Sequence, residues 1–170
     1  MGKVLSQDQI QAYKEDGFIS PIDVMSEDEA HHYATRLQAA ETQYPQDLAG
    51  ANRNNAHLCF SLLDELAYHP KVLDAVEDLL GADFSLWGSV LFIKEPSSSH
   101  FVSWHQDATY MHITPHNFVT PWIALTPSNL HTGCMSMIPG SHLNDIQPHN
   151  DTYGADNILT RGQEVTNVDA

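Results

Sequence analysis

Residues 84–93 read F-S-L-W-G-S-V-L-F-I, and this stretch decides the fold. It is rich in aromatic and branched apolar residues and lacks proline, which is typical of a β-strand. Residues 102–110, 119–125 and 134–138 have a similar character, and a Pro139-Gly140-Ser141 turn follows the last of them. We therefore predict four strands from residue 84 onward.

Before residue 84 the pattern is helical. Ser26 and Glu29 have the spacing of a capping box, in which each side chain bonds the backbone of the other residue. Pro70 suits the first turn of a helix, and Gly81 suits the position just after a helix end. We predict helices over residues 7–16, 26–43, 58–67 and 70–80.

Helices followed by strands favour an α+β or mostly β domain with an antiparallel sheet or barrel, rather than alternating βαβ units. A chain of 170 residues is typical of one domain. We predict a single domain over residues 1–170, helical over 1–82 and β over 83–170.

The composition excludes several partners. Asp and Glu total 22 against 7 Lys and Arg, so the formal net charge is -15, and such a surface repels nucleic acids and anionic membranes. The N-terminal residues have no apolar run long enough for a signal peptide or a membrane span. Its two cysteines, Cys59 and Cys134, are too few for a disulfide framework and are expected as reduced, mostly buried thiols. We predict a cytoplasmic protein.

Residues 103–110, S-W-H-Q-D-A-T-Y, contain the candidate metal ligands. In a strand, His105 and Asp107 project to one face and Gln106 to the other, so we assign Gln106 no ligand role. An imidazole and a carboxylate on one face are two of the three ligands in the 2-His-1-carboxylate triad of non-haem Fe(II) oxygenases. A hydrogen-bonded surface His–Asp pair is the commoner explanation for this spacing alone.

The surrounding sequence decides between these interpretations. Three stretches occur in order: K-E-P-S-S-S-H-F-V-S-W-H-Q-D-A-T-Y (94–110), F-V-T-P-W-I-A-L (118–125) and G-C-M-S-M-I-P-G-S-H (133–142). From about residue 84 to 165 the chain resembles the phytanoyl-CoA dioxygenase family. The resemblance implies a double-stranded β-helix (a cupin-like jelly roll) with an N-terminal helical layer. It also implies a hydroxylase that uses Fe(II), 2-oxoglutarate and dioxygen on a small organic substrate.

The resemblance assigns roles to four residues. His105 and Asp107 match the family's two upstream iron ligands and are the expected catalytic residues. Lys94 and Trp122 fall where the family lines its 2-oxoglutarate pocket. An exposed strand-end lysine and a core tryptophan are the alternative interpretations of these last two residues.

The family pattern also includes a distal histidine ligand and an arginine that binds 2-oxoglutarate. After His131 only His142 and His149 remain, the first in the P-G-S-H segment and the second in an expected polar loop, and Arg161 is the only late arginine. We therefore expect a jelly roll incomplete at its C-terminus, with strand edges open to pairing with another chain. The alternative function is a non-catalytic jelly-roll fragment that binds a metal, a small ligand or another chain.

Overall fold

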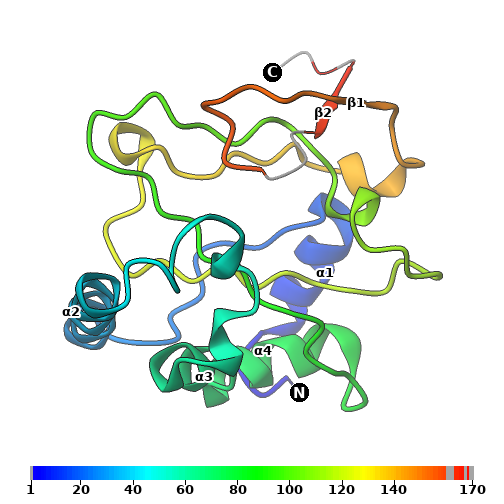
Figure 1. Cartoon of the computed structure of the whole chain (residues 1–170). Coiled ribbons are helices and arrows are strands. Elements are labelled where there is room, and N and C mark those ends of the chain that lie inside the picture. The colour runs from blue at the N-terminus through cyan, green and yellow to red at the C-terminus, as the bar shows by residue number, and fades with distance from the viewer. Residues whose placement is uncertain (1, 160–162, 167, 169–170) are drawn as a thin grey trace. The chain divides into compact units, whose positions relative to one another are not determined.

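The computed structural model describes residues 2–159, 163–166 and 168. Its elements are α1 (Gln7–Asp16), α2 (Glu27–Gln43), α3 (Ser61–Ala67), α4 (Pro70–Leu80), β1 (His149–Asp151) and β2 (Gln163–Val165) (Figure 1). Short 3₁₀ turns lie at η1 (Gly50–Arg53), η2 (Ala56–Leu58), η3 (Asp107–Thr109), η4 (Leu130–Thr132) and η5 (Ser141–Leu143). The chain divides into a first unit, Met1–Leu91 with Phe118–Pro139, and a second unit, Phe92–Asn117 with Gly140–Ala170.

The four predicted helices are confirmed. Ser26 is the N-cap of α2, and the capping box that it forms with Glu29 is present. A second capping box, which the sequence analysis missed, joins Ser6 to Gln9 at the start of α1. The predicted helix over 58–67 is shorter than expected, because η2 covers its first residue and α3 begins at Ser61.

The apolar core of the first unit lies between α2, α3 and the loop that joins them. Its buried residues are Leu48, Ala56, Leu62, Leu63 and Leu66. Tyr33, Leu37 and Ala40 of α2 pack against it at helical spacing. Ile123 and Leu125 pack against it from the segment over 118–139, which places that segment in the first unit.

The four predicted strands are wrong for the part of the chain that the structure describes. Residues 84–93, 102–110, 119–125 and 134–138 form no ladder there, and only single bridges occur, at Asn54–Val90 and Phe101–Asn157. Residues 107–109 turn into η3 instead. Side-chain alternation shows that a segment suits a sheet, but a strand exists only where a neighbouring backbone completes its hydrogen bonds.

The second unit contains the sheet that the sequence analysis did not predict. It consists of β1 and β2 (Figure 1). The two strands are antiparallel, with His149 opposite Val165 and Asp151 opposite Gln163. The amide of Val165 donates to the carbonyl of Trp104 at 2.9 Å, so residues 103–106 run alongside this small sheet. The described residues thus show helices and one two-stranded sheet, and the double-stranded β-helix is not seen.

Two expectations about the cysteines and membranes can be compared with the structure. Cys59 and Cys134 are both free thiols, but Cys59 is exposed and Cys134 is half-buried, so the expectation of mostly buried thiols is wrong. Within the described ranges, no helix has the length and apolar character needed to cross a membrane.

Candidate metal centre

The structure brings His105 and Asp107 together. Nε2 of His105 lies 3.2 Å from Oδ1 of Asp107, and their side chains are 20% and 42% exposed. Gln106 between them is extended, with φ -113° and ψ 125°, and Asp107 begins η3. A strand would place residues 105 and 107 on one face, and here one extended residue before a tight turn has that effect.

The ring of His105 is oriented by the backbone. Its Nδ1 lies 2.8 Å from the carbonyl oxygen of Ser103, and because a carbonyl only accepts, Nδ1 carries a proton. Nε2 therefore faces Asp107 as the nitrogen available to a metal. An Nδ1–H bond to a backbone carbonyl is the usual second contact of a metal-binding histidine.

The pKa of His105 follows from this arrangement. Burial lowers it, but the hydrogen bond to Asp107, the bond to the Ser103 carbonyl and the negative charge of Asp107 together outweigh burial. The net pKa is raised above its ordinary value. The site therefore favours positive charge at Nε2, and a divalent cation would take the place of that proton.

The donor set fits Fe(II) as two of its ligands. Imidazole nitrogen and carboxylate oxygen are the ligand types of non-haem iron sites. Two adjacent ligand atoms at about 2.1 Å from one octahedral ion lie about 3 Å apart, close to the separation seen here. The rings of Tyr110 and His105 meet edge to face, with their centroids 5.7 Å apart.

Buried polar contacts support this segment. Ser103 is only 6% exposed. Its hydroxyl donates to the carbonyl of Gln163 at 2.8 Å and accepts from the Asn157 side chain at 2.9 Å. The backbone that holds the His105 ring is therefore tied to two segments more than fifty residues away along the chain.

The two predicted cosubstrate residues, Lys94 and Trp122, belong to different units of the chain. Lys94 is exposed and belongs to the second unit, as His105 does. Trp122 is 45% exposed and belongs to the first unit. Their roles in binding 2-oxoglutarate remain predictions, and Arg161 lies outside the described residues.

Among the residues that the structure describes, no third metal ligand joins the pair. Over residues 2–159, 163–166 and 168, no group of three His, Cys, Asp or Glu side chains could hold a metal ion. His142 lies in η5 and is exposed. His149 does not lie in a loop as expected but begins β1, and its ring contacts the backbone of Gln106. The sequence analysis missed this contact, because the two residues are 43 positions apart.

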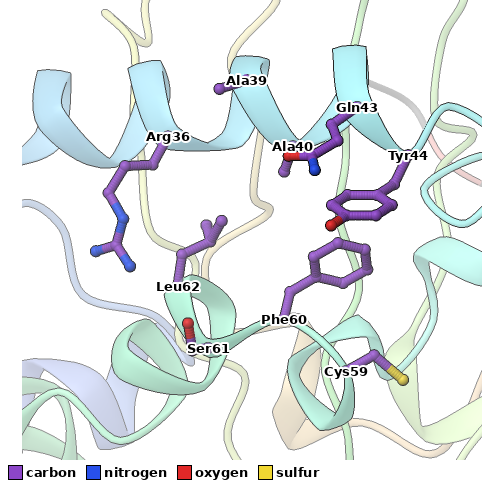
Figure 2. A pocket seen from close by; sticks show the side chains of 9 residues that line it. All are labelled: Arg36, Ala39, Ala40, Gln43, Tyr44, Cys59, Phe60, Ser61 and Leu62. Atoms are coloured by element: carbon purple, nitrogen blue, oxygen red, sulfur yellow. The ribbon is translucent and has the colours of Figure 1, made fainter.

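The first unit also contains a pocket of about 580 Å³ between α2 and residues 59–62 (Figure 2). The Tyr44 and Phe60 rings meet edge to face within it, 5.8 Å apart. The guanidinium of Arg36 is held by both carboxylate oxygens of Glu65, at 2.6 and 2.8 Å. No predicted site residue lines this pocket, so it lends no support to a catalytic centre there.

Comparison with known proteins gives the family. The phytanoyl-CoA dioxygenase (PhyH) family model matches residues 13–166. The chain is 34% identical over 95 residues to a probable alpha-ketoglutarate-dependent hypophosphite dioxygenase of Stutzerimonas stutzeri. This match covers 56% of this chain and 33% of that protein. The chain is also 31% identical over 99 residues to the peroxisomal phytanoyl-CoA dioxygenase of Bos taurus, a match that covers 55% of this chain and 29% of that protein. No solved structure matches the chain significantly.

Relatives named as dioxygenases and an adjacent imidazole and carboxylate together indicate the oxygenase class. The chain belongs to the phytanoyl-CoA dioxygenase family, since the family model matches most of its length. The resemblance deduced from the sequence motifs is thereby confirmed. The matched part spans about a third of the length of the Stutzerimonas and Bos relatives.

Proposed function

We propose that this chain is part of an Fe(II)- and 2-oxoglutarate-dependent dioxygenase that hydroxylates a C–H bond of a small organic substrate. The observation that carries the proposal is the 3.2 Å pairing of His105 and Asp107, in a chain that belongs to an oxygenase family. A single oxygenase domain over residues 1–170, built as a double-stranded β-helix, is part of this proposal.

The chain's own residues have distinct tasks in this function. Nε2 of His105 and the carboxylate of Asp107 would hold the ion, and the Ser103 carbonyl keeps the imidazole turned toward it. When bound, Fe(II) would supply open coordination positions for 2-oxoglutarate and dioxygen, together with the redox chemistry of hydroxylation. The described residues provide two ligands, so the proposal requires a third from outside them.

The names of the relatives and the composition of the chain both bear on the class of substrate. The bovine relative is named for phytanoyl-CoA and the Stutzerimonas relative for hypophosphite. Coenzyme A phosphates are recognised by basic side chains, and this chain has 7 Lys and Arg in all. A small polar substrate without coenzyme A therefore suits the chain better. We also propose Lys94 and Trp122 as parts of the 2-oxoglutarate pocket, and a cytoplasmic location.

Anaerobic titration of the purified chain with Fe(II) and 2-oxoglutarate tests the proposal. We expect the visible charge-transfer band of the iron complex in the wild type and its loss in His105→Ala and Asp107→Ala. His112→Ala is the matched control, because His112 is exposed and lies in the same unit. A band that persists in both site variants would contradict the proposal.

One observation favours a second candidate, a non-catalytic relative that binds a metal, a small ligand or another chain. Among the described side chains no three-ligand group is present, and two ligands hold Fe(II) less firmly than three. If the folded wild-type chain gives no band at any Fe(II) and 2-oxoglutarate concentration, this second candidate is supported. Self-association through open strand edges belongs to this candidate and would appear as a concentration-dependent mass in sedimentation.

A further inference from the structure

Both ring nitrogens of His149 are engaged. Nδ1 lies 2.7 Å from the carbonyl oxygen of Gln147, so Nδ1 carries a proton and donates it. Nε2 accepts the backbone N–H of Gln106 at 3.0 Å, so Nε2 carries none. This fixes His149 as a neutral imidazole protonated on Nδ1. With both nitrogens used, His149 is not the missing third ligand in this arrangement.

The partner of Nε2 is the residue between the two metal ligands. Gln106 is also the N-cap of η3, and it forms no side-chain bond to the free amides of that turn. Its own side chain reaches the other way, and its Oε1 accepts the amide of Gln147 at 2.7 Å. Gln106, Gln147 and His149 therefore form a closed clamp, in which backbone and side-chain groups of each segment bond the other.

We propose that His149 is a positioning residue, which holds the backbone of Gln106 so that His105 and Asp107 face one metal ion. This rests on the proposed function, since it gives His149 a purpose only if the pair binds a metal. Rotation about the Gln106 backbone would swing Asp107 away from His105, because only one residue separates them. The contacts of Ser103 hold the backbone just before His105, and the clamp holds the backbone of Gln106, just before Asp107.

Two substitutions at His149 are needed to test the hydrogen bond from Gln106, because loss of the ring also removes its contacts with Gln147 and Thr109. His149→Ala removes the acceptor and leaves a half-buried amide unpaired. His149→Gln keeps an oxygen acceptor at similar reach and should restore much of the effect. Removing groups that orient metal ligands typically weakens metal affinity about 10- to 100-fold, and we expect a loss in this range for His149→Ala.

The experiment uses Mn²⁺, which takes the same nitrogen and oxygen ligands as Fe(II) and can be handled in air. In an isotope-labelled chain, Mn²⁺ binding is followed by paramagnetic broadening of the amide signals of residues 103–110. We expect His149→Ala to bind Mn²⁺ 10- to 100-fold more weakly than the wild type, His149→Gln to lie near the wild type, and His112→Ala to match it. Circular dichroism checks that each variant is folded.

A second readout needs neither metal nor variant. In the wild-type chain, the ¹⁵N shifts of the His149 ring should show a protonated Nδ1 and an unprotonated Nε2. The opposite tautomer would overturn the clamp even if every variant failed to fold.

The outcomes separate the two proposals. Wild-type binding with an unchanged His149→Ala affinity would overturn the role of His149 and leave the proposed function standing. Equal losses in His149→Ala and His149→Gln would overturn the hydrogen-bond explanation. If the folded wild-type chain binds no Mn²⁺, the proposed function fails, and the role of His149 fails with it.

Discussion

At the scale of single residues, the candidate site depends on hydrogen bonds between buried or half-buried polar groups. Ser103 shows this best, because its hydroxyl both donates and accepts while its carbonyl holds His105. One of these hydrogen bonds joins Ser103 to the candidate ligand His105, and the other two join it to Gln163 and Asn157, which are distant in the sequence. The geometry of a two-ligand motif is therefore set by residues that touch no metal.

Replacing Ser103 by alanine tests this support. Loss of the hydroxyl leaves the Gln163 carbonyl and the Asn157 amide short of a partner, which should cost about 1–3 kcal/mol of local stability. Hydrogen exchange of the Val165 amide, which bonds Trp104, measures that local free energy. Exposed Ser99→Ala is the matched control. Equal protection of Val165 in both variants would contradict the assignment.

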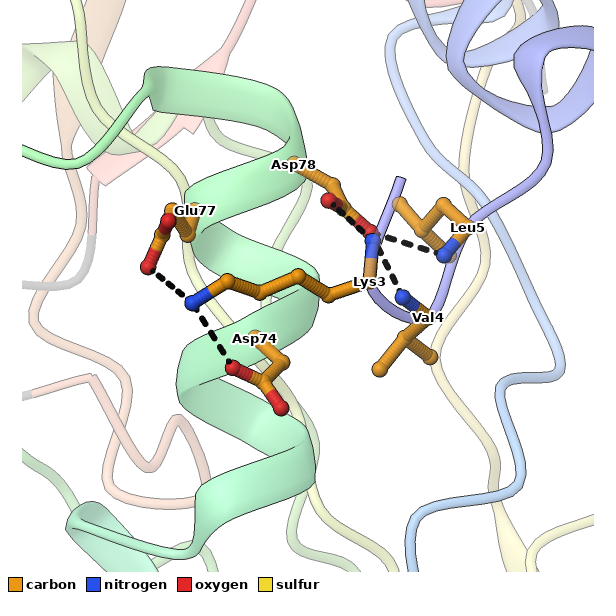
Figure 3. A network of polar contacts seen from close by, with 6 residues as sticks. All are labelled: Lys3, Val4, Leu5, Asp74, Glu77 and Asp78. Atoms are coloured by element: carbon orange, nitrogen blue, oxygen red, sulfur yellow. Dashed lines mark hydrogen bonds and ion pairs between the residues drawn. The ribbon is translucent and has the colours of Figure 1, made fainter. Parts of the chain in front are cut away.

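At the scale of elements, α4 holds the N-terminal segment through three of its carboxylates. Asp78 accepts the backbone amides of Lys3, Val4 and Leu5 at 2.7, 2.8 and 2.8 Å (Figure 3). The Lys3 ammonium pairs with Asp74 and Glu77 on the same helix. Partial burial raises the pKa of Asp78, but the three amides and the Lys3 charge outweigh it, so the net pKa lies below its ordinary value.

The sign of this pKa shift predicts a pH dependence. A carboxyl with a lowered folded-state pKa stabilises the fold above its unfolded pKa of about 3.9, and this contribution is lost as pH falls through the folded value. Asp78→Asn keeps one acceptor and loses the bond to Lys3, so we expect a loss of about 1–2 kcal/mol at pH 7 for this partly exposed site. Urea unfolding at pH 7 and pH 3 should show the difference from wild type shrinking at pH 3. If the difference in unfolding free energy between the wild type and Asp78→Asn is larger at pH 3 than at pH 7, the prediction is wrong.

The N-cap of α2 allows a second prediction at this scale. The Ser26 hydroxyl accepts the amide of Glu29 at 3.2 Å, and the Glu29 carboxylate accepts the amide of Ser26 at 2.8 Å. Ser26→Ala should lower the free energy of unfolding by about 0.5–2 kcal/mol, while Ser26→Asp keeps a capping oxygen and should lose little. Chemical denaturation measures both variants, and equal losses would show that capping is not the cause.

At the scale of the whole molecule, the two units are built differently. The buried apolar residues of the described chain, from Leu5 to Val76, all lie in the first unit. In the second unit the buried residues that the structure describes are Ser103 and Gln163, both polar. The second unit is therefore stabilised mainly by hydrogen bonds. It gains little from the burial of apolar side chains, although such burial is the larger stabilising term in most folded proteins.

This difference predicts unequal stability. Native-state hydrogen exchange should show the amides of β1 and β2 opening at a lower free energy than those of α3 and α4, because few apolar contacts hold the second unit closed. Trp104 fluorescence, isolated by replacing Trp87 and Trp122 with phenylalanine, should change at lower urea concentration than the helical circular dichroism signal. If the fluorescence and circular dichroism transitions coincide, and the amides of both units are equally protected from exchange, the prediction of unequal stability is wrong.

The sequence by itself determined what depends on neighbouring residues. The helices were predictable because capping residues, Pro70 and Gly81 act within one turn of the chain. The closeness of His105 to Asp107 was predictable because one residue separates them. The family was predictable because its motifs occur in order along the chain.

Only the tertiary structure decided what depends on distant segments. The stretch over 84–93 has the composition of a strand but forms only the Asn54–Val90 bridge, whereas the mostly polar residues 149–151 and 163–165 pair with each other. The sequence predicts a loop position for His149, but its ring accepts a hydrogen bond from the Gln106 amide, 43 positions away. A strand and a clamp both require a partner backbone, and local composition shows which segments could pair without showing which segments meet.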